Sequence, residues 1–268
     1  MRFLPLLPFC FGIVWAQQSP STRDMDAINW MEFREWVPAR IDTVLLPLGT
    51  MEPHGVTANG TDIIIPGAMA REIAPRVNAL IAPVVPYGFT GTLDAYPGSF
   101  TIPETIYRAY VRAVLVGLAQ NKFKNLIMLN GHGGGQTALL AALAQEVGRE
   151  TNTRILSVNW WSYCSDVCQE VFGEDGGHAG NTETAYTLAI DPALVEKKRY
   201  SGPKMAAAIP APNTWSAYPF PSSILLYKEG EGYPNFDLAK AKTYFRKVNE
   251  KVAGLIEDTI EKWNRAGL

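Results

Sequence analysis

Short apolar runs alternate with amphipathic segments along most of the chain. The apolar runs predict strands at 43–48, 80–85, 126–129 and 155–158. The segments between them predict helices at 66–73, 103–120 and 136–147, and apolar residues at helical spacing predict a closing helix across 241–263. Continuous apolar strands separated by helices are typical of a mostly parallel sheet that is buried on both faces. We therefore expect a single α/β domain at 28–268, with helices flanking both faces of the sheet.

Two stretches interrupt this alternation. Residues 17–27 are polar and turn-rich, which predicts a flexible lead before the domain. Residues 201–236 are rich in Pro, Ser and aromatic residues, so we expect an irregular excursion over one end of the sheet.

Residues 1–16 have the pattern of a secretory signal peptide. A basic start is followed by an apolar run too short to span a membrane, and Val14 and Ala16 occupy the small-residue positions of a signal-peptidase site. We expect cleavage after Ala16 and export, to a periplasm or to the exterior. The alternative is a disordered or packed apolar N-terminus, because Pro5 and Pro8 interrupt the run.

Composition narrows the class of partner. The chain has 268 residues and 47% hydrophobic content, enough for one large core, and its formal net charge is -2. With no long run of Lys and Arg, nothing indicates binding to nucleic acid or to a membrane after signal cleavage. A small-molecule substrate fits this composition better.

Cys164 and Cys168 are an even pair once Cys10 leaves with the signal. A disulfide can persist after export, but two cysteines four residues apart on one helix are poorly placed for one, so both states stay open. Two thiolates alone would leave a tetrahedral metal site half filled.

The chain contains only three histidines, and each lies in a glycine-bearing motif at His54, His132 and His178. Neutral imidazole is a common ligand of zinc-like ions, so this sparing use indicates chemistry. A lone histidine is more often a hydrogen-bonded structural group, but three such motifs together favour a site.

Carboxylates accompany these histidines. Glu52 and Asp62 lie on the same predicted loop as His54, which gives a partial N/O shell suited to zinc, manganese or iron(II). His132 follows a strand and is the expected later ligand. Glu183 is the expected ligand or general base, and His178 the substrate binder or proton shuttle. Alternatively, Asp62 caps the following helix. Trp160 and Trp161 follow a predicted strand and could either line a substrate pocket or pack in the core; both alternatives stay open.

These motifs resemble the creatininase (creatinine amidohydrolase) family. The matching segments occur in the family's order and span roughly residues 28–260; they lie at 46–55, 60–62, 86–88, 96–98, 127–134 and 178–184. The resemblance implies an α/β fold and a two-metal site, with zinc or manganese and in some members iron. It also implies hydrolysis of a C–N bond in a cyclic or formyl amide by activated water, and assembly as a hexamer.

The resemblance also implies roles for individual residues. Glu52, His54, Asp62 and His132 match ligand positions, with Asp62 bridging. Creatininase proper has a glutamate two residues after the histidine matching His132, where this chain has Gly134. Glu183 is then the substitute, as ligand and catalytic base.

Several departures from the family pattern fall among residues expected to face the substrate. Pro53 replaces a common glutamine, a second histidine is missing, the loop before Asp62 is one residue shorter, Gly135 replaces an asparagine, and Asn181 replaces a glutamate. The resemblance therefore does not fix creatinine as substrate. Deformylation, small-peptide cleavage and opening of a keto-sugar ring stay as alternatives. Two further alternatives are not enzymes: an exported metal- or solute-binding protein without turnover, and a non-catalytic subunit of a larger assembly.

Overall fold

The structure is a computed structural model that describes residues 19–174, 177–200, 214, 217–219 and 234–268. The predicted signal peptide at 1–16 and most of the predicted excursion at 201–236 lie outside these residues.

Four parallel strands form the centre of the molecule in the order β2-β1-β3-β4. They are β1 (Thr43–Leu48), β2 (Ala79–Ile81), β3 (Asn125–Asn130) and β4 (Arg154–Asn159). Leu48, Asn130 and Asn159 stand in register, so β1, β3 and β4 all end at one edge. The loops that follow these strands are therefore brought together at that edge.

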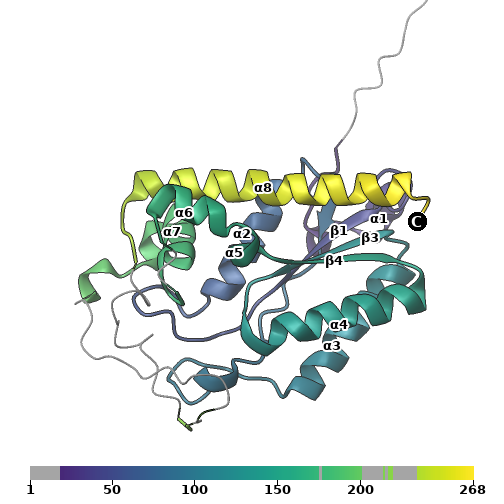
Figure 1. Cartoon of the computed structure of the whole chain (residues 1–268). Coiled ribbons are helices and arrows are strands. Elements are labelled where there is room, and N and C mark those ends of the chain that lie inside the picture. The colour runs from purple at the N-terminus through teal and green to yellow at the C-terminus, as the bar shows by residue number, and fades with distance from the viewer. Residues whose placement is uncertain (1–18, 175–176, 201–213, 215–216, 220–233) are drawn as a thin grey trace, which may run out of the picture.

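Helices cover both faces of the sheet, which confirms the predicted fold class (Figure 1). One face carries α3 (Glu104–Gln120) and α4 (Gly134–Thr151). The other carries α2 (Thr61–Ile73), α6 (Ser165–Phe172), α7 (Asn181–Ile190) and the long α8 (Leu238–Arg265). Shorter helices are α1 (Trp30–Trp36) and α5 (Trp160–Tyr163). None of the described helices combines the length and apolar character needed to cross a bilayer.

The core has two halves, because successive side chains of a strand point to opposite faces. In β1, Val44, Leu46 and Leu48 pack with α3 and α4, whereas Leu45 packs with α2, α7 and α8. All of β1 and β3 is buried, as the unbroken apolar runs predict for a sheet covered on both sides.

Several element boundaries differ from the sequence prediction, among them the end of β2 and the start of α2. β2 ends at Ile81 and not at residue 85. The N–H groups of Ala82 and Val85 still donate to the carbonyls of Leu45 and Pro47, but three residues of one segment then span two of the other, so the regular register is lost and Val85 forms only an isolated bridge with Leu48. α2 begins at Thr61, ahead of the predicted start at Pro66, which lies inside the helix.

The predicted lead at 17–27 pairs with the sheet in its described C-terminal part. Asp24 bridges Ile81, and the N–H of Ile81 donates to the carbonyl of Arg23. The Arg23 guanidinium donates to the carbonyl of Ala79 at 2.8 Å. This pairing uses the open backbone groups of the edge strand β2, which no local pattern in the lead reveals.

Candidate metal centre

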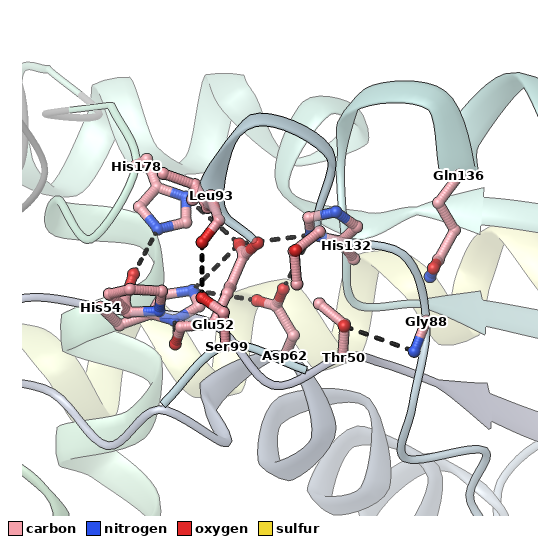
Figure 2. Close-up of polar contacts among 12 residues, drawn as sticks. Thr50, Glu52, His54, Asp62, Gly88, Leu93, Ser99, His132, Gln136 and His178 are labelled. Atoms are coloured by element: carbon pink, nitrogen blue, oxygen red, sulfur yellow. Dashed lines mark hydrogen bonds and ion pairs between the residues drawn. The ribbon is translucent and has the colours of Figure 1, made fainter. Parts of the chain in front are cut away.

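All six predicted site residues meet at the carboxyl edge of the sheet. Figure 2 shows the three histidines together with Glu52 and Asp62. The site residues come from three segments. Glu52, His54 and Asp62 lie between β1 and the first turn of α2, His132 follows β3, and His178 and Glu183 lie at the start of α7.

Two glycines let these segments approach one another. A Cβ atom on Gly49, just after β1, would lie 2.3 Å from the carbonyl oxygen of Asp62. One on Gly131, just after β3, would lie 2.0 Å from the same oxygen. Only glycine permits such close contact between backbones, so both strand ends press against the first turn of α2. Asp62 is thereby carried between the other two segments.

Asp62 faces two different imidazoles. Its Oδ1 lies 3.0 Å from His54 Nε2, and its Oδ2 lies 3.0 Å from His132 Nδ1. Helix α2 has Gly60 as its N-cap without a side-chain capping bond, so the alternative of Asp62 as a helix cap is wrong. The carboxylate is directed instead into the cluster.

The other two carboxylates complete the cluster. Glu52 Oε1 lies 3.2 Å from His132 Nδ1 and 3.6 Å from His178 Nδ1. Glu183 Oε2 lies 3.7 Å from His54 Nε2 and accepts the N–H of Ala179 at 2.6 Å. Each carboxylate thus has an oxygen beside an imidazole nitrogen.

Backbone carbonyls fix the orientation of two rings. His54 Nδ1 lies 3.0 Å from the carbonyl of Glu52, and His178 Nε2 lies 2.8 Å from the carbonyl of Pro53. Because a carbonyl only accepts, each of these nitrogens carries its proton, and the other nitrogen of each ring faces the carboxylates. The two rings stack with centroids 4.4 Å apart. Anchoring one nitrogen and presenting the other is the arrangement found in metal-binding histidines.

The electrostatics of the cluster oppose the usual effect of burial. Burial lowers the pKa of a histidine, yet the charges of Asp62 and Glu183 raise the pKa of His54 well above its usual value. Burial likewise lowers the pKa of His132, but bonds to Asp62 and Glu52 raise it to about 10. Burial raises the pKa of a carboxyl, but the imidazoles lower the pKa of both Asp62 and Glu183. The carboxylates therefore stay ionised and attract any available cation.

The donor set fits a divalent cation. Glu52 Oε2 is buried and has no hydrogen-bond partner among the described residues, a costly arrangement unless something else binds it. Ligand atoms lie within 4.8 Å of one another in three groups: Glu52, Asp62 and His132; His54, Asp62 and Glu183; and Glu52, His54 and His178. Imidazole with carboxylate suits zinc, manganese and iron(II). Asp62 belongs to the first two groups, so two ions could share it.

All members of the cluster except His54 line a cavity of about 670 Å³. Trp161 lines this cavity, whereas Trp160 is buried in the core. Sequence reasoning missed further lining residues, namely Phe89, Thr90, Leu93, Ser162, Ser165 and Thr182. The hydroxyl of Thr90 is buried and has no hydrogen-bond partner among the described residues. Ser162 and Ser165 could have been found from their position, since they come soon after β4, at the edge of the sheet where the cluster lies.

The two cysteines are separate from this site. Both are buried, and they are thiols, not a disulfide. Cys168 lies within α6 and donates its S–H to the carbonyl of Glu174 at 3.3 Å. The helical spacing explains why the predicted possibility of a bridge is not realised.

A parallel α/β domain with a buried N/O ligand cluster at its strand ends defines a class of candidate metal-dependent enzymes. A model of the creatininase family, described as creatinine amidohydrolase, matches residues 26–255. The chain belongs to the creatininase family and is a hydrolase of that family.

Curated relatives span several activities. The creatinine amidohydrolase of Pseudomonas putida is 25% identical over 190 residues, which are 64% of this chain and 73% of that protein. The mycofactocin precursor peptide peptidase of Mycobacterium ulcerans is 30% identical over 182 residues, 62% of this chain and 65% of that protein. The 3-dehydro-scyllo-inosose hydrolase of Thermotoga maritima is 25% identical over 168 residues, 59% of this chain and 53% of that protein.

Solved structures share the fold. One described as creatininase Mn has a TM-score of 0.76 at 21% identity, over 89% of this chain and 98% of that one. A variant creatininase of the Zn-Zn type has a TM-score of 0.75 at 21% identity, with the same coverage of 89% and 98%. The likeness confirms the predicted single-domain, three-layer architecture.

Proposed function

We propose that this chain is a metal-dependent hydrolase that cleaves a C–N bond of a cyclic or linear amide with activated water. The observation that carries the proposal is Asp62, which is buried between two imidazoles and belongs to two candidate ligand groups. A carboxylate placed in this way can bridge two ions. Structural relatives described as Mn and Zn-Zn forms support manganese and zinc as the ions to test first.

In this proposal the ligands divide between two ions. Glu52, Asp62 and His132 would hold one, and His54, Asp62 and Glu183 would hold the other. Divalent ions bound there would polarise an amide carbonyl and make a water molecule more acidic. Glu183 takes the place of the glutamate that creatininase proper has where this chain has Gly134.

Glu183 and His178 carry the proton transfers. Glu183 is 15% exposed on the cavity wall, and the bond from the Ala179 N–H holds one of its oxygens. It accepts the proton of the attacking water. His178 also lines the cavity, with its Nε2–H fixed on the carbonyl of Pro53. Protonated at Nδ1, it stabilises the developing oxyanion or protonates the leaving nitrogen.

The cavity is suited to a small-molecule amide. Its volume of about 670 Å³ lies within the range of ordinary small-ligand sites. The named activities of the relatives concern creatinine, a precursor peptide and an inosose, so a substrate panel should contain cyclic amides, formyl amides, short peptides and keto-sugars.

Metal removal and reconstitution test the proposal. Protein stripped with a chelator should lose hydrolysis of its best panel substrate and regain it when Zn²⁺, Mn²⁺ or Fe²⁺ is added. The proposal fails if the reconstituted protein hydrolyses none of the panel. If it binds ions without any turnover, the alternative of a metal- or solute-binding protein takes its place.

We also propose that the chain is exported and assembles as a homo-oligomer, a hexamer by family resemblance. Expression of the full chain should yield an exported product that begins at Gln17, as read by N-terminal sequencing. Light scattering on that product measures the assembly. An intact N-terminus in the cytosolic fraction would contradict export, and a monomer would contradict assembly.

A further inference from the structure

Asn130, the last residue of β3, is buried directly behind His132. Its Oδ1 accepts the backbone N–H of His132 at 3.2 Å, and its Nδ2 donates to the backbone carbonyl of His132 at 2.7 Å. One side-chain amide therefore holds both backbone polar groups of the histidine. Rotating the amide by half a turn would place donor against donor and acceptor against acceptor, so only one orientation satisfies both bonds.

Neighbouring amides hold Asn130 in this orientation. Gln136, buried in the first turn of α4, donates its Nε2 to Asn130 Oδ1 at 2.9 Å (Figure 2 shows Gln136 beside the cluster). Asn130 Nδ2 donates to Asn159 Oδ1 at 2.8 Å, and Asn159 is the register partner of Asn130 at the end of β4. The amide is thus fixed from a helix and from a second strand, as required of a rigid support.

The backbone of His132 also has little room to move. Gly131 stands between Asn130 and His132, and a Cβ atom on it would lie 2.0 Å from the carbonyl oxygen of Asp62. A shift of this loop toward α2 would therefore collide with the helix that carries Asp62. The Asn130 amide prevents a shift in the other direction by holding the loop to the sheet.

We propose that Asn130 is a positioning residue for ion binding, which it supports by fixing the backbone of His132. This holds His132 Nδ1 at 3.0 Å from Asp62 Oδ2 and 3.2 Å from Glu52 Oε1. The inference rests on the proposed function, because it takes His132 as an ion ligand. Groups that orient a ligand from behind typically change metal affinity by about 10- to 100-fold when removed.

Asn125 provides a matched control, because it is a second buried asparagine at the opposite end of the same strand. Its Nδ2 donates to Thr43 Oγ1 at 3.0 Å and to Asp42 Oδ1 at 3.3 Å, and it touches no member of the cluster through any described contact. Both Asn→Leu changes remove a buried amide of similar size from β3. A general loss of stability would therefore affect both variants.

The experiment measures the dissociation constants of Mn²⁺ and Zn²⁺ by titration calorimetry on metal-free protein, with thermal unfolding of the same samples. Asn130→Leu should weaken binding of at least one ion about 10- to 100-fold, and Asn125→Leu should leave it within about twofold. Gln136→Leu removes one support of Asn130 and should weaken binding several-fold. If Asn130→Leu does not fold, Gln136→Leu takes its place in the comparison with Asn125→Leu.

The outcomes separate the two proposals. If the wild-type chain binds ions and the Asn130 and Gln136 variants bind them equally well, the positioning role is wrong and the proposed function stands. Equal weakening by Asn125→Leu would also overturn it, because the effect would then be a general loss of stability. If the wild-type chain binds neither ion, both proposals fall together.

Discussion

The two ends of the sheet bury polar side chains in opposite ways. At the amino end, Asn125 donates to Asp42 and Thr43, and Arg154 donates to Asn125 Oδ1 at 3.4 Å. Acceptors there face donors. Arg154 Nε has no hydrogen-bond partner among the described residues, but it is part of a positively charged guanidinium group and so cannot bind a metal cation. These polar groups connect β1, β3 and β4 and need nothing more.

At the carboxyl end, three carboxylates crowd around a few imidazole nitrogens, so acceptors outnumber donors. Glu52, Asp62 and Glu183 converge on imidazole nitrogens, and Glu52 Oε2 has no hydrogen-bond partner among the described residues although it is buried. Such an arrangement is costly for a fold by itself, because ionised groups lose hydration and repel one another. The difference teaches that buried polarity indicates a site where it gathers surplus acceptors, and indicates only structure where donors and acceptors match.

Asp62 and Asp42 give the strongest test of this difference. Asp62→Asn should remove both ions, because it reduces the charge of the carboxylate shared by both ligand groups. Asp42→Asn should keep the wild-type ion content and cost about 1 kcal/mol of stability through its altered hydrogen bonds. Metal analysis of the purified proteins, by plasma mass spectrometry, checks both. Retention of two ions by Asp62→Asn would contradict a bridging role.

Glu183→Gln separates an enzyme from a binding protein. It should lower kcat on the best substrate about 10²- to 10⁴-fold, the usual contribution of a general base. The control is Glu170→Gln, which removes a carboxylate that pairs with Lys247 at the surface of α6 and α8. Steady-state kinetics at saturating metal should show no change for this control. Unchanged kcat in Glu183→Gln would remove the residue from the catalytic machinery.

Ion binding should stabilise the folded chain through the carboxyl end only. At an ion concentration 100 times the Kd, the gain in unfolding free energy is about 2.7 kcal/mol per site. For a domain of this size, each kcal/mol raises Tm by roughly 2–4 °C. Thermal unfolding with and without chelator measures the shift. Asn125→Leu should lower both Tm values and keep their difference, whereas Asp62→Asn should abolish it; a shift that survives in Asp62→Asn would locate the ions elsewhere.

Much of this fold could be predicted from sequence, because its signals are local. The buried strand 43–48 is an unbroken apolar run, and the structure places β1 at those residues. The three histidine motifs also meet in one cluster, as their scarcity and their places after a strand or before a helix indicate.

What sequence missed depends on contacts between distant segments. The pairing of Asp24 with Ile81 needs the open edge of β2, which the polar composition of the lead does not reveal. Thr90, which is distant in sequence from His132 and His178, lines the same cavity as they do. The role of Asn130 follows only from the positions of Gln136 and Asn159 around it. A pattern along the chain does not contain these relations.

The smallest expected effect on function concerns Cys164, a buried acid that lies outside the cluster. It tests whether burial alone acts on its pKa in the usual way. Burial raises the pKa of its thiol to about 12, the ordinary response of a buried acid, whereas the same burial fails to raise the pKa of Asp62 or Glu183. At pH 8 the folded protein should therefore hold about a thousandfold less thiolate than a thiol with the usual pKa of about 9, and native alkylation should be slow. Because the folded pKa is raised, the group's contribution to stability is complete below pH 9 and is lost as the pH rises from 9 toward 12. Mass spectrometry after timed alkylation, with and without denaturant, measures this difference. Fast labelling of native Cys164 would show that burial does not keep this thiol neutral. Cys164 could then no longer serve as the buried acid with which Asp62 and Glu183 are compared.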